Sequence, residues 1–587
     1  MQLSDAPPAS TADAPQVSRP SSLTGFWILA AALIAFAFGL CAQPSPIVDF
    51  FWQARTGSWI LEHHAVPHGD LYSWTRQGHP WIVHEWAMCV LLWKTYAAGG
   101  YPGVWLLMWG LVSLTFIALF YKVWLETGRA TLTAFALTLW AAKMCSPLIS
   151  PRPHLISYLC LVLLLWIVLD ARRDPAKLKR LWLLPPLCAF WANFHGAVVV
   201  GVAIAATFAI LDAVDALLLR SAPAERRAQM LAFAKRSAAV IPVSAAAMLI
   251  NPYGWKLFAI FTQTVGDKIM PNFVSEWKSL DFHSPFGIVF EILMVLFVLG
   301  LGMSRERRDL SEVIVLIILM HSGLTASRNV PIFGMAGVLI AARHIQSALA
   351  GALKIEETEK QGKSPSLFGA SPSVAIIAIV ALAVCLQSAM SAKEAVVKAP
   401  PGDDAGLAKI SRVAFAMDGF PSGACDFLHR ERFPAAAKLY NAYNWGSYIL
   451  WSAPEYPVFI STQTDVFFGK VLTDYTKMCN QPHDWNKILG DYNPDMIMLP
   501  ASDGQTWMFM TDPNWVLVYA DDANLDTDKH TNAVIFVRHL PKYEALIQRC
   551  RRDCEALRTH PELGASQPLT QPSTVRNAGV PASPSHS

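Results

Sequence analysis

The chain has 587 residues, of which 53% are hydrophobic and only 16% are charged. Soluble domains carry roughly 25% charged residues, so the composition excludes an ordinary globular protein. The net charge of +3 is small, and no dense block of Lys and Arg resembles a nucleic-acid-binding tract. The composition therefore predicts an α-helical polytopic membrane protein.

The chain contains about 11 apolar stretches that are predicted to be transmembrane helices. Residues 1–24, rich in Pro, Ser and Ala, are expected to form a disordered cytoplasmic tail. The stretch 25–43 can span the roughly 30 Å hydrocarbon core, and no convincing cleavage site follows it, so we expect an uncleaved first span. Residues 86–98 are too short to cross and are expected to lie along or dip into the membrane. The other predicted spans are 102–121, 130–147, 154–170, 181–194, 197–219, 237–251, 286–303, 310–325, 330–347 and 372–391.

The loop charges predict the orientation of this bundle. Lys and Arg residues are more than twice as frequent in the loops on the side of the N-terminus as in the opposite loops. Because short cytoplasmic loops accumulate Lys and Arg, we expect the N-terminus to be cytoplasmic. An odd number of spans then places the chain beyond residue 392 on the opposite, outer side.

Polar residues in a hydrophobic context gather in the loops on that outer side. Ionisable groups at or near membrane depth are costly and indicate function by default. Because these residues share one side, we expect one shared site; a channel would distribute its polar groups along its full depth. They include Asp49, Asp70, His84, Glu85, Arg152, His154, Asn193, His195, Asn251, Glu276 and Arg328.

The first outer loop, residues 44–85, begins and ends with a carboxylate. Asp49 directly follows the first span, and Glu85 closes the loop. If the fold brings both to one mouth, one could take a proton from an acceptor hydroxyl while the other holds a cation or orients the acceptor. Alternatively, Asp49 caps the amphipathic helix expected around Trp52 and Trp59. The spacing alone leaves both interpretations open.

Several motifs carry a resemblance to a known group of proteins. The chain is similar to a widespread bacterial family of largely uncharacterised polytopic membrane proteins, grouped by similarity with the GT-C glycosyltransferases that use lipid-linked sugars. The resemblance covers roughly residues 25 to 540. Its motifs are Asp49-Phe-Phe-Trp-Gln-Ala-Arg55, Pro80-Trp81-x-x-His84-Glu85-Trp86, Arg152-Pro153-His154, Asn193-Phe-His195-Gly196, Asn251-Pro252-Tyr253-Gly254, Glu276-Trp277 and Arg328-Asn329-x-Pro331.

The resemblance implies a reaction and a set of site residues. It implies a membrane glycosyltransferase that moves a sugar from a polyprenyl-phosphate-linked donor to an extracytoplasmic glycan, lipid or protein. Asp49 matches the acidic residue that serves as catalytic base or acceptor-positioning group, with Glu85 as its acidic partner. A Mg²⁺ or Mn²⁺ ion held by Asp49 and Glu85 is one option. The implied location is a bacterial inner (cytoplasmic) membrane with a periplasmic C-terminal domain. The predicted substrate-binding residues are Arg152, His154, His195, Arg328, Asp70 and His84.

Other interpretations of these residues remain open. Arg152 and Arg328 could instead reach to lipid head groups, and His195 could be an interior hydrogen-bonded histidine. The tryptophans fit an interfacial belt, and the histidines around Asp70 fit a turn better than a metal site. The alternative function is a non-enzymatic transporter or assembly factor for surface polysaccharide. It predicts an internal repeat, and no motif recurs at a fixed offset.

The segment 393–558 is predicted to be a separate extracytoplasmic α/β domain. Strands are expected at Val458–Ser461, Met496–Leu499, Trp515–Ala520 and Ala533–Val537, with helical stretches such as Asp484–Leu489 between some of them. Asn444-Trp445-Gly446-x-Tyr448 also resembles the bacterial family, where it precedes a strand often ending in an Asp-Gly-Arg-like turn. Here that turn reads Ser461-Thr-Gln-Thr-Asp465 and departs from the pattern. We expect an accessory or acceptor-recognition module, followed by a disordered tail at 559–587.

Overall fold

The fold was analysed in a computed structural model. It describes residues 20–45, 47–259, 269, 273–353, 374–397, 405–434, 437–480, 485–521 and 532–550. The predicted tail at 559–587 lies outside the described residues, as does most of the predicted tail at 1–24. The first helix begins at Pro20, a few residues before the predicted end of that tail.

Long apolar helices make up most of the described chain, so it is a multi-pass membrane protein. Eight helical segments among the described residues are long and apolar enough to cross a membrane. Every predicted span coincides with a helix, which confirms the predicted polytopic class; the number of spans stays a prediction. The helices are α1 (Pro20–Cys41), α3 (Trp86–Glu126), α4 (Thr131–Cys145), α5 (His154–Arg173), α6 (Leu184–Phe194), α7 (Val198–Val214), α8 (Ala224–Ala247), α11 (Pro285–Met303), α12 (Leu310–Thr325), α13 (Val330–Ala352) and α15 (Val374–Val397).

The first outer loop folds into helix α2 (Val48–His63), which packs against the first part of α3. A Cβ atom at Gly57 would lie 2.0 Å from the carbonyl oxygen of Cys89, so only glycine allows the two backbones to approach this closely. Helix α3 changes direction at Gly100, whose φ is +58°, just before Pro102. Because a proline ring clashes with the preceding helical turn, residues 86–99 form a segment of their own, as predicted for 86–98.

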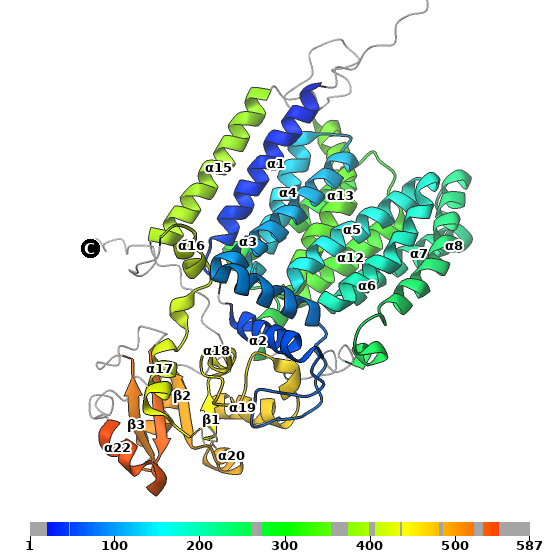
Figure 1. Ribbon diagram of the computed structural model, residues 1–587. Helices are drawn as coiled ribbons and strands as arrows, with labels where there is room; N and C mark the ends of the chain where they lie inside the picture. Colours follow the sequence, from blue (N-terminus) through cyan, green and yellow to red (C-terminus); the bar gives the residue numbers. More distant parts are fainter. Residues whose placement is uncertain are drawn as a thin grey trace, which may run out of the picture.

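The C-terminal part is an α/β domain, as predicted. Its sheet has the order β1-β2-β4-β3, in which β1 runs parallel to β2 and the other pairs are antiparallel. The strands are β1 (Leu439–Asn441), β2 (Met496–Pro500), β3 (Trp515–Ala520) and β4 (Ala533–Arg538). The helices are α16 (Gly406–Ala414), α17 (Ser422–Glu431), α18 (Tyr443–Ser452), α19 (Lys470–Asn480), α20 (Trp485–Tyr492), α21 (Gly504–Thr511) and α22 (Glu544–Cys550). Figure 1 shows this domain below the helical bundle, with α2 and α18 between them.

One predicted strand is wrong. Residues 458–461 form no strand, and Val458 makes only isolated bridges to Ser73 and Leu439. The Asn441 side chain forms hydrogen bonds with the backbone of the residues that follow Val458. Its amide nitrogen donates to the carbonyl of Ile460 (2.8 Å), and its oxygen accepts from the N–H of Phe459 (2.9 Å). A side chain therefore replaces the sheet ladder in this segment.

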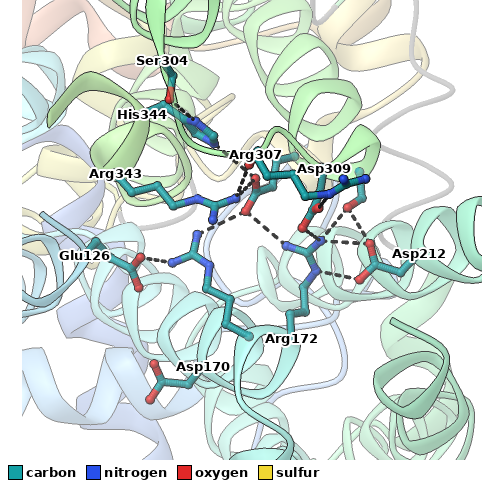
Figure 2. Close-up of polar contacts among 12 residues, drawn as sticks. Glu126, Asp170, Arg172, Asp212, Ser304, Arg307, Asp309, Arg343 and His344 are labelled. Carbon is teal, nitrogen blue, oxygen red and sulfur yellow. Dashed lines mark hydrogen bonds and ion pairs between the residues drawn. The ribbon is translucent and has the colours of Figure 1, made fainter. Parts of the chain in front are cut away.

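A buried ionic network joins several helix ends around the C-terminal end of α5, opposite the end that begins with His154 (Figure 2). Arg172 is 1% exposed and forms a bidentate ion pair with Asp212, at 2.8 and 2.9 Å. Glu312 pairs with Arg173 (3.1 Å) and with Arg343 (2.6 Å). These arginines were expected in or next to cytoplasmic loops. Instead, they turn inward and tie α5, α7, α12 and α13 together.

Candidate active site

A cavity of about 550 Å³ lies where the helical bundle, the first outer loop and the C-terminal domain meet. Its wall contains all of the predicted site residues except Asp70. These residues come from loops that are far apart in the sequence, so the fold assembles the site. They are Asp49, His84, Glu85, Arg152, His154, His195 and Arg328.

Arg152 joins two carboxylates in the wall of this cavity. Its guanidinium lies 2.6 Å from the Asp49 carboxylate and 2.6 Å from that of Glu276. Burial acts to lower the pKa of Arg152, but Asp49 and Glu276 raise it above its usual value. The same pairing holds the pKa of Glu276 below its usual range, although burial acts to raise it. Arg152 is therefore held by protein carboxylates and does not extend to lipid head groups.

Asp49 does not cap its helix. The N-cap of α2 is Ile47, and no side chain caps this end. The carboxylate of Asp49 instead faces Arg152 and accepts a hydrogen bond from the indole N–H of Trp52 (3.3 Å). The capping interpretation is wrong, and Asp49 stands in the cavity as a charge-paired carboxylate.

Glu85 is ionised and tightly held. It lies 3.2 Å from His84 and accepts a hydrogen bond from the side-chain amide of Gln53 (2.7 Å). Burial acts to raise the pKa of Glu85, but His84 and Gln53 lower it to about 2. Burial likewise acts to lower the pKa of His84, whereas Glu85 raises it above its usual value. His84 and Glu85 thus form an ion pair in the wall of the cavity.

His195 is an interior, hydrogen-bonded histidine. The indole N–H of Trp191 donates to the Ser157 hydroxyl (2.7 Å), and that hydroxyl lies 2.7 Å from Nδ1 of His195. A serine hydroxyl has one proton and two lone pairs, so it can accept from Trp191 and either donate to Nδ1 or accept from it. Burial lowers the pKa of His195 to about 3. The imidazole is therefore neutral and carries one N–H.

Arg328 has no ion-pair or hydrogen-bond partner among the described residues. Its guanidinium stacks over the ring of Trp277, 4.5 Å from the centroid, and lines the cavity. A guanidinium carries five N–H donors in a fixed fork, so these donors are open to an anion in the cavity.

The cavity is amphipathic. Its apolar part is lined by side chains of the membrane helices, including Leu161, Val199 and Ile332. Its polar part is closed by Trp52 and Trp81 and by the segment 462–465 of the C-terminal domain. A molecule with a long apolar tail and a charged head group would match this division.

The fold was compared with known proteins. No family model matches the sequence, and no curated protein matches it. Among solved structures, the archaeal oligosaccharyltransferase AglB from Archaeoglobus fulgidus, in complex with an inhibitory peptide and a dolichol-phosphate, has a TM-score of 0.53. Its identity is 11%, and the match covers 81% of this chain and 69% of that chain. The apo form of the Archaeoglobus fulgidus oligosaccharyltransferase has a TM-score of 0.51 and 9% identity, over 83% and 70% of the two chains. The chain has the GT-C fold. The predicted fold class is thereby confirmed.

A third structure of that archaeal enzyme, in complex with zinc and sulfate, aligns with a TM-score of 0.46 at 11% identity, over 81% and 68% of the two chains. In the GT-C fold of this chain, no group of three or more His, Cys, Asp or Glu side chains among the described residues could hold a metal ion. The carboxylate of Asp49 faces Arg152, and that of Glu85 faces His84 and Gln53. The two predicted ligands therefore do not fit a shared divalent cation.

Asp70 lies outside the cavity of this GT-C fold. Its carboxylate accepts hydrogen bonds from the backbone N–H and hydroxyl of Ser73 (3.0 and 2.6 Å) and from the N–H of Tyr72 (3.2 Å). These contacts define a turn that shapes the first outer loop. Asp70 was predicted to bind substrate; the structure gives it a structural position instead, in line with the alternative interpretation as a turn.

The C-terminal domain supplies cavity residues that the sequence analysis did not select. The main ones are Gln463 and Asp465, and Gln53 joins them from α2. The sequence did mark this segment, because the turn Ser461–Asp465 departs from the family pattern. Glu276 was expected at the shared outer site but was given no role there, and the structure shows that it holds Arg152 directly.

The Asn-Trp-Gly motif positions this segment. A Cβ atom at Gly446 would lie 2.0 Å from the carbonyl oxygen of Ile460 and 2.8 Å from the Cα of Ser461. The next residue, Ser447, lies 2.7 Å from the Thr462 hydroxyl. Helix α18 therefore holds residues 460–462 at a distance that only glycine permits.

Gly446→Ala is expected to destabilise the C-terminal domain by about 1–3 kcal/mol, because the added methyl group overpacks against backbone. Thermal unfolding followed by tryptophan fluorescence would measure this effect. Gly490→Ala is the matched control, since a Cβ atom at this position in α20 meets nothing within 4 Å. Equal unfolding temperatures for the two variants would contradict the assigned role of Gly446.

Proposed function

We propose that the chain is a membrane glycosyltransferase that transfers a sugar from a polyprenyl-phosphate-linked donor to an extracytoplasmic acceptor. The observation that carries this proposal is Arg328, which lines an amphipathic cavity and has no ion-pair or hydrogen-bond partner among the described residues. Arg binds phosphate oxygens in pairs. The polyprenyl chain would lie along the apolar part of the cavity, beside Leu161 and Val199.

The remaining side chains have roles that fit their contacts. Arg152 and His154 lie in the same cavity wall as Arg328. Arg152 adds positive charge near the phosphate, whereas His154 donates from Nε2 to the carbonyl of Leu148 and keeps only the acceptor Nδ1 for a ligand. The neutral His195 can form a hydrogen bond with the donor. Asp49, held in place by Arg152, would orient the acceptor or accept its proton. Glu85 and His84 keep the polar wall fixed through their ion pair.

The resemblance to a bacterial family suggests a bacterial inner membrane, and the loop charges support an orientation with the N-terminus in the cytoplasm and the cavity on the periplasmic side. A lipid-linked sugar would then reach the apolar part of the cavity from the outer leaflet. The acceptor would enter between the first outer loop and the C-terminal domain. The GT-C fold shared with an archaeal oligosaccharyltransferase is consistent with this arrangement.

The proposal is tested by incubating the purified protein in detergent with a panel of radiolabelled undecaprenyl-phosphate sugars and methyl glycosides as acceptors, with and without Mg²⁺ or Mn²⁺. We expect label to be released from one donor. Asp49→Asn should lower that rate roughly 100-fold, because the carboxylate that pairs with Arg152 and orients the acceptor is lost. Asp491→Asn, at an exposed position on α20, is the control and should keep the wild-type rate.

Two results would count against the proposal. If the folded wild-type protein releases label from none of the donors, transfer is wrong, and a transporter or assembly factor becomes the better interpretation. If Asp49→Asn keeps the full rate, the function stands but the role of Asp49 is wrong. The two added metals test in the same assay whether transfer depends on a divalent cation.

A further inference from the structure

Gln463 is a buried side chain whose polar atoms have no protein partner. It is 1% exposed and lines the cavity. Neither its amide nitrogen nor its carbonyl oxygen has a hydrogen-bond partner among the described residues. Leaving buried polar groups unpaired costs roughly 1–3 kcal/mol each, so such a side chain is expected to have a ligand.

A second amide faces the same cavity. Gln53 is 2% exposed, and its nitrogen donates to Glu85, whereas its carbonyl oxygen has no partner among the described residues. Together, the two side chains offer one free amide nitrogen and two free carbonyl oxygens to a ligand. An amide presents a donor and acceptors side by side, and a hydroxyl group can both donate and accept. Polyhydroxylated molecules are the chemical class that matches this arrangement.

Asp465 lies two residues after Gln463 and also lines the cavity. Its side chain does not cap the short helix at 464–467, and it forms no ion pair within 4 Å among the described residues. The ionisable groups that act on it are those of His84, Glu85 and Tyr253. Burial raises the pKa of Asp465 to about 7; the charge of His84 opposes this rise and that of Glu85 adds to it. A carboxylate that titrates near neutral pH is suited to accept a proton. Asp49, by contrast, is already paired with Arg152.

We propose that Gln463 and Asp465 form the acceptor subsite, that the acceptor offers a sugar hydroxyl, and that Asp465 accepts the proton of that hydroxyl. This inference rests on the proposed function. The proton of the acceptor O–H passes to the Asp465 carboxylate while the acceptor oxygen bonds to the anomeric carbon of the donor. The bond from that carbon to the phosphate oxygen breaks, and its electron pair leaves with the polyprenyl phosphate. Asp49 then orients the acceptor.

The binding part is tested by saturation-transfer NMR with methyl α-D-glucopyranoside, methyl α-D-mannopyranoside and methyl β-D-galactopyranoside. At least one glycoside should bind the wild type, and Gln463→Leu should weaken its affinity by about tenfold or more, because two hydrogen bonds are lost. Gln548→Leu, at an exposed site on α22, should leave the affinity unchanged. Undecaprenyl phosphate, followed by quenching of tryptophan fluorescence, should bind all three proteins alike.

These two probes separate the possible failures. If undecaprenyl phosphate binds and no glycoside does, or if an asparagine-containing hexapeptide binds in their place, the sugar-hydroxyl subsite is wrong while the proposed function stands. Equal glycoside affinity of Gln463→Leu and the wild type also contradicts the subsite. If neither the lipid nor a glycoside binds, the proposed function and the subsite fail together.

The role of Asp465 is tested by the pH dependence of transfer from the donor that the panel identifies. An ionised carboxylate is needed, so the wild-type rate should rise with pH and level off above about pH 7. In Asp465→Asn, the rate should be lower by roughly 100-fold or more and should no longer rise with pH. In His84→Gln, the rate should still rise with pH, but the rise should occur at higher pH, because the charge of His84 lowers the pKa of Asp465. A rising limb that persists in Asp465→Asn would overturn the role.

Discussion

Arg328→Gln is expected to lower label release from a polyprenyl-phosphate sugar by roughly 100- to 1,000-fold. Preorganised donors aimed at developing charge contribute on this scale, and the phosphate becomes more negative as its bond to the sugar breaks. Arg328 is held over Trp277 at the cavity wall, and it spends no donor on a described protein group. Removing its charge therefore removes stabilisation of the leaving group directly.

Two further variants decide whether Arg328 binds phosphate or only packs. Arg328→Lys keeps the charge but loses the paired N–H donors and the flat stack on Trp277, so it should recover only part of the rate. Arg430→Gln removes an exposed arginine of α17 and should have no effect. A wild-type rate in Arg328→Gln, with unchanged folding, would show that Arg328 does not contact the phosphate.

The helical bundle could be predicted from the sequence because membrane spans depend on local properties. Twenty or so apolar residues in a row predict a span without any knowledge of their neighbours. The same holds for the break in α3, where Gly100 and Pro102 act through their own backbone preferences. The gathering of Arg152 and Arg328 near Asp49 also followed from topology, since loops on one side of a membrane share one surface.

The parts that could not be predicted depend on contacts between distant residues. Val458–Ser461 has strand-like composition, but the Asn441 side chain takes up the backbone groups that a ladder would use. Asp70 carries the same charge as Asp49, and only its turn with Ser73 shows that its oxygens are occupied. Gln463 stands out because its partners are absent among the described residues, which no sequence pattern reports.

The buried ionic network at the other end of α5 leads to the second large prediction. Arg172→Met is expected to lower the free energy of unfolding by about 3–5 kcal/mol, because removing one partner leaves uncompensated buried charges. Asp212, which pairs with Arg172 in Figure 2, is fully buried. Glu312 and Ser311 also lie within contact of the guanidinium. The effect can be measured in detergent by heating with a thiol-reactive dye, since Cys145, Cys160 and Cys188 are buried free thiols in the bundle.

The same network predicts how a second change should act. Asp212→Asn added to Arg172→Met should recover part of the lost stability, because it removes the charge of the carboxylate that had paired with Arg172. Glu312 keeps Arg173 and Arg343 as partners, so its charge stays compensated in both variants. Arg236→Met, on the exposed face of α8, is the control and should melt like the wild type. If Arg172→Met reacts with the dye at the same temperature as Arg236→Met, the network contributes no net stability, and its arginines would be held in place by the packing of the helices around them.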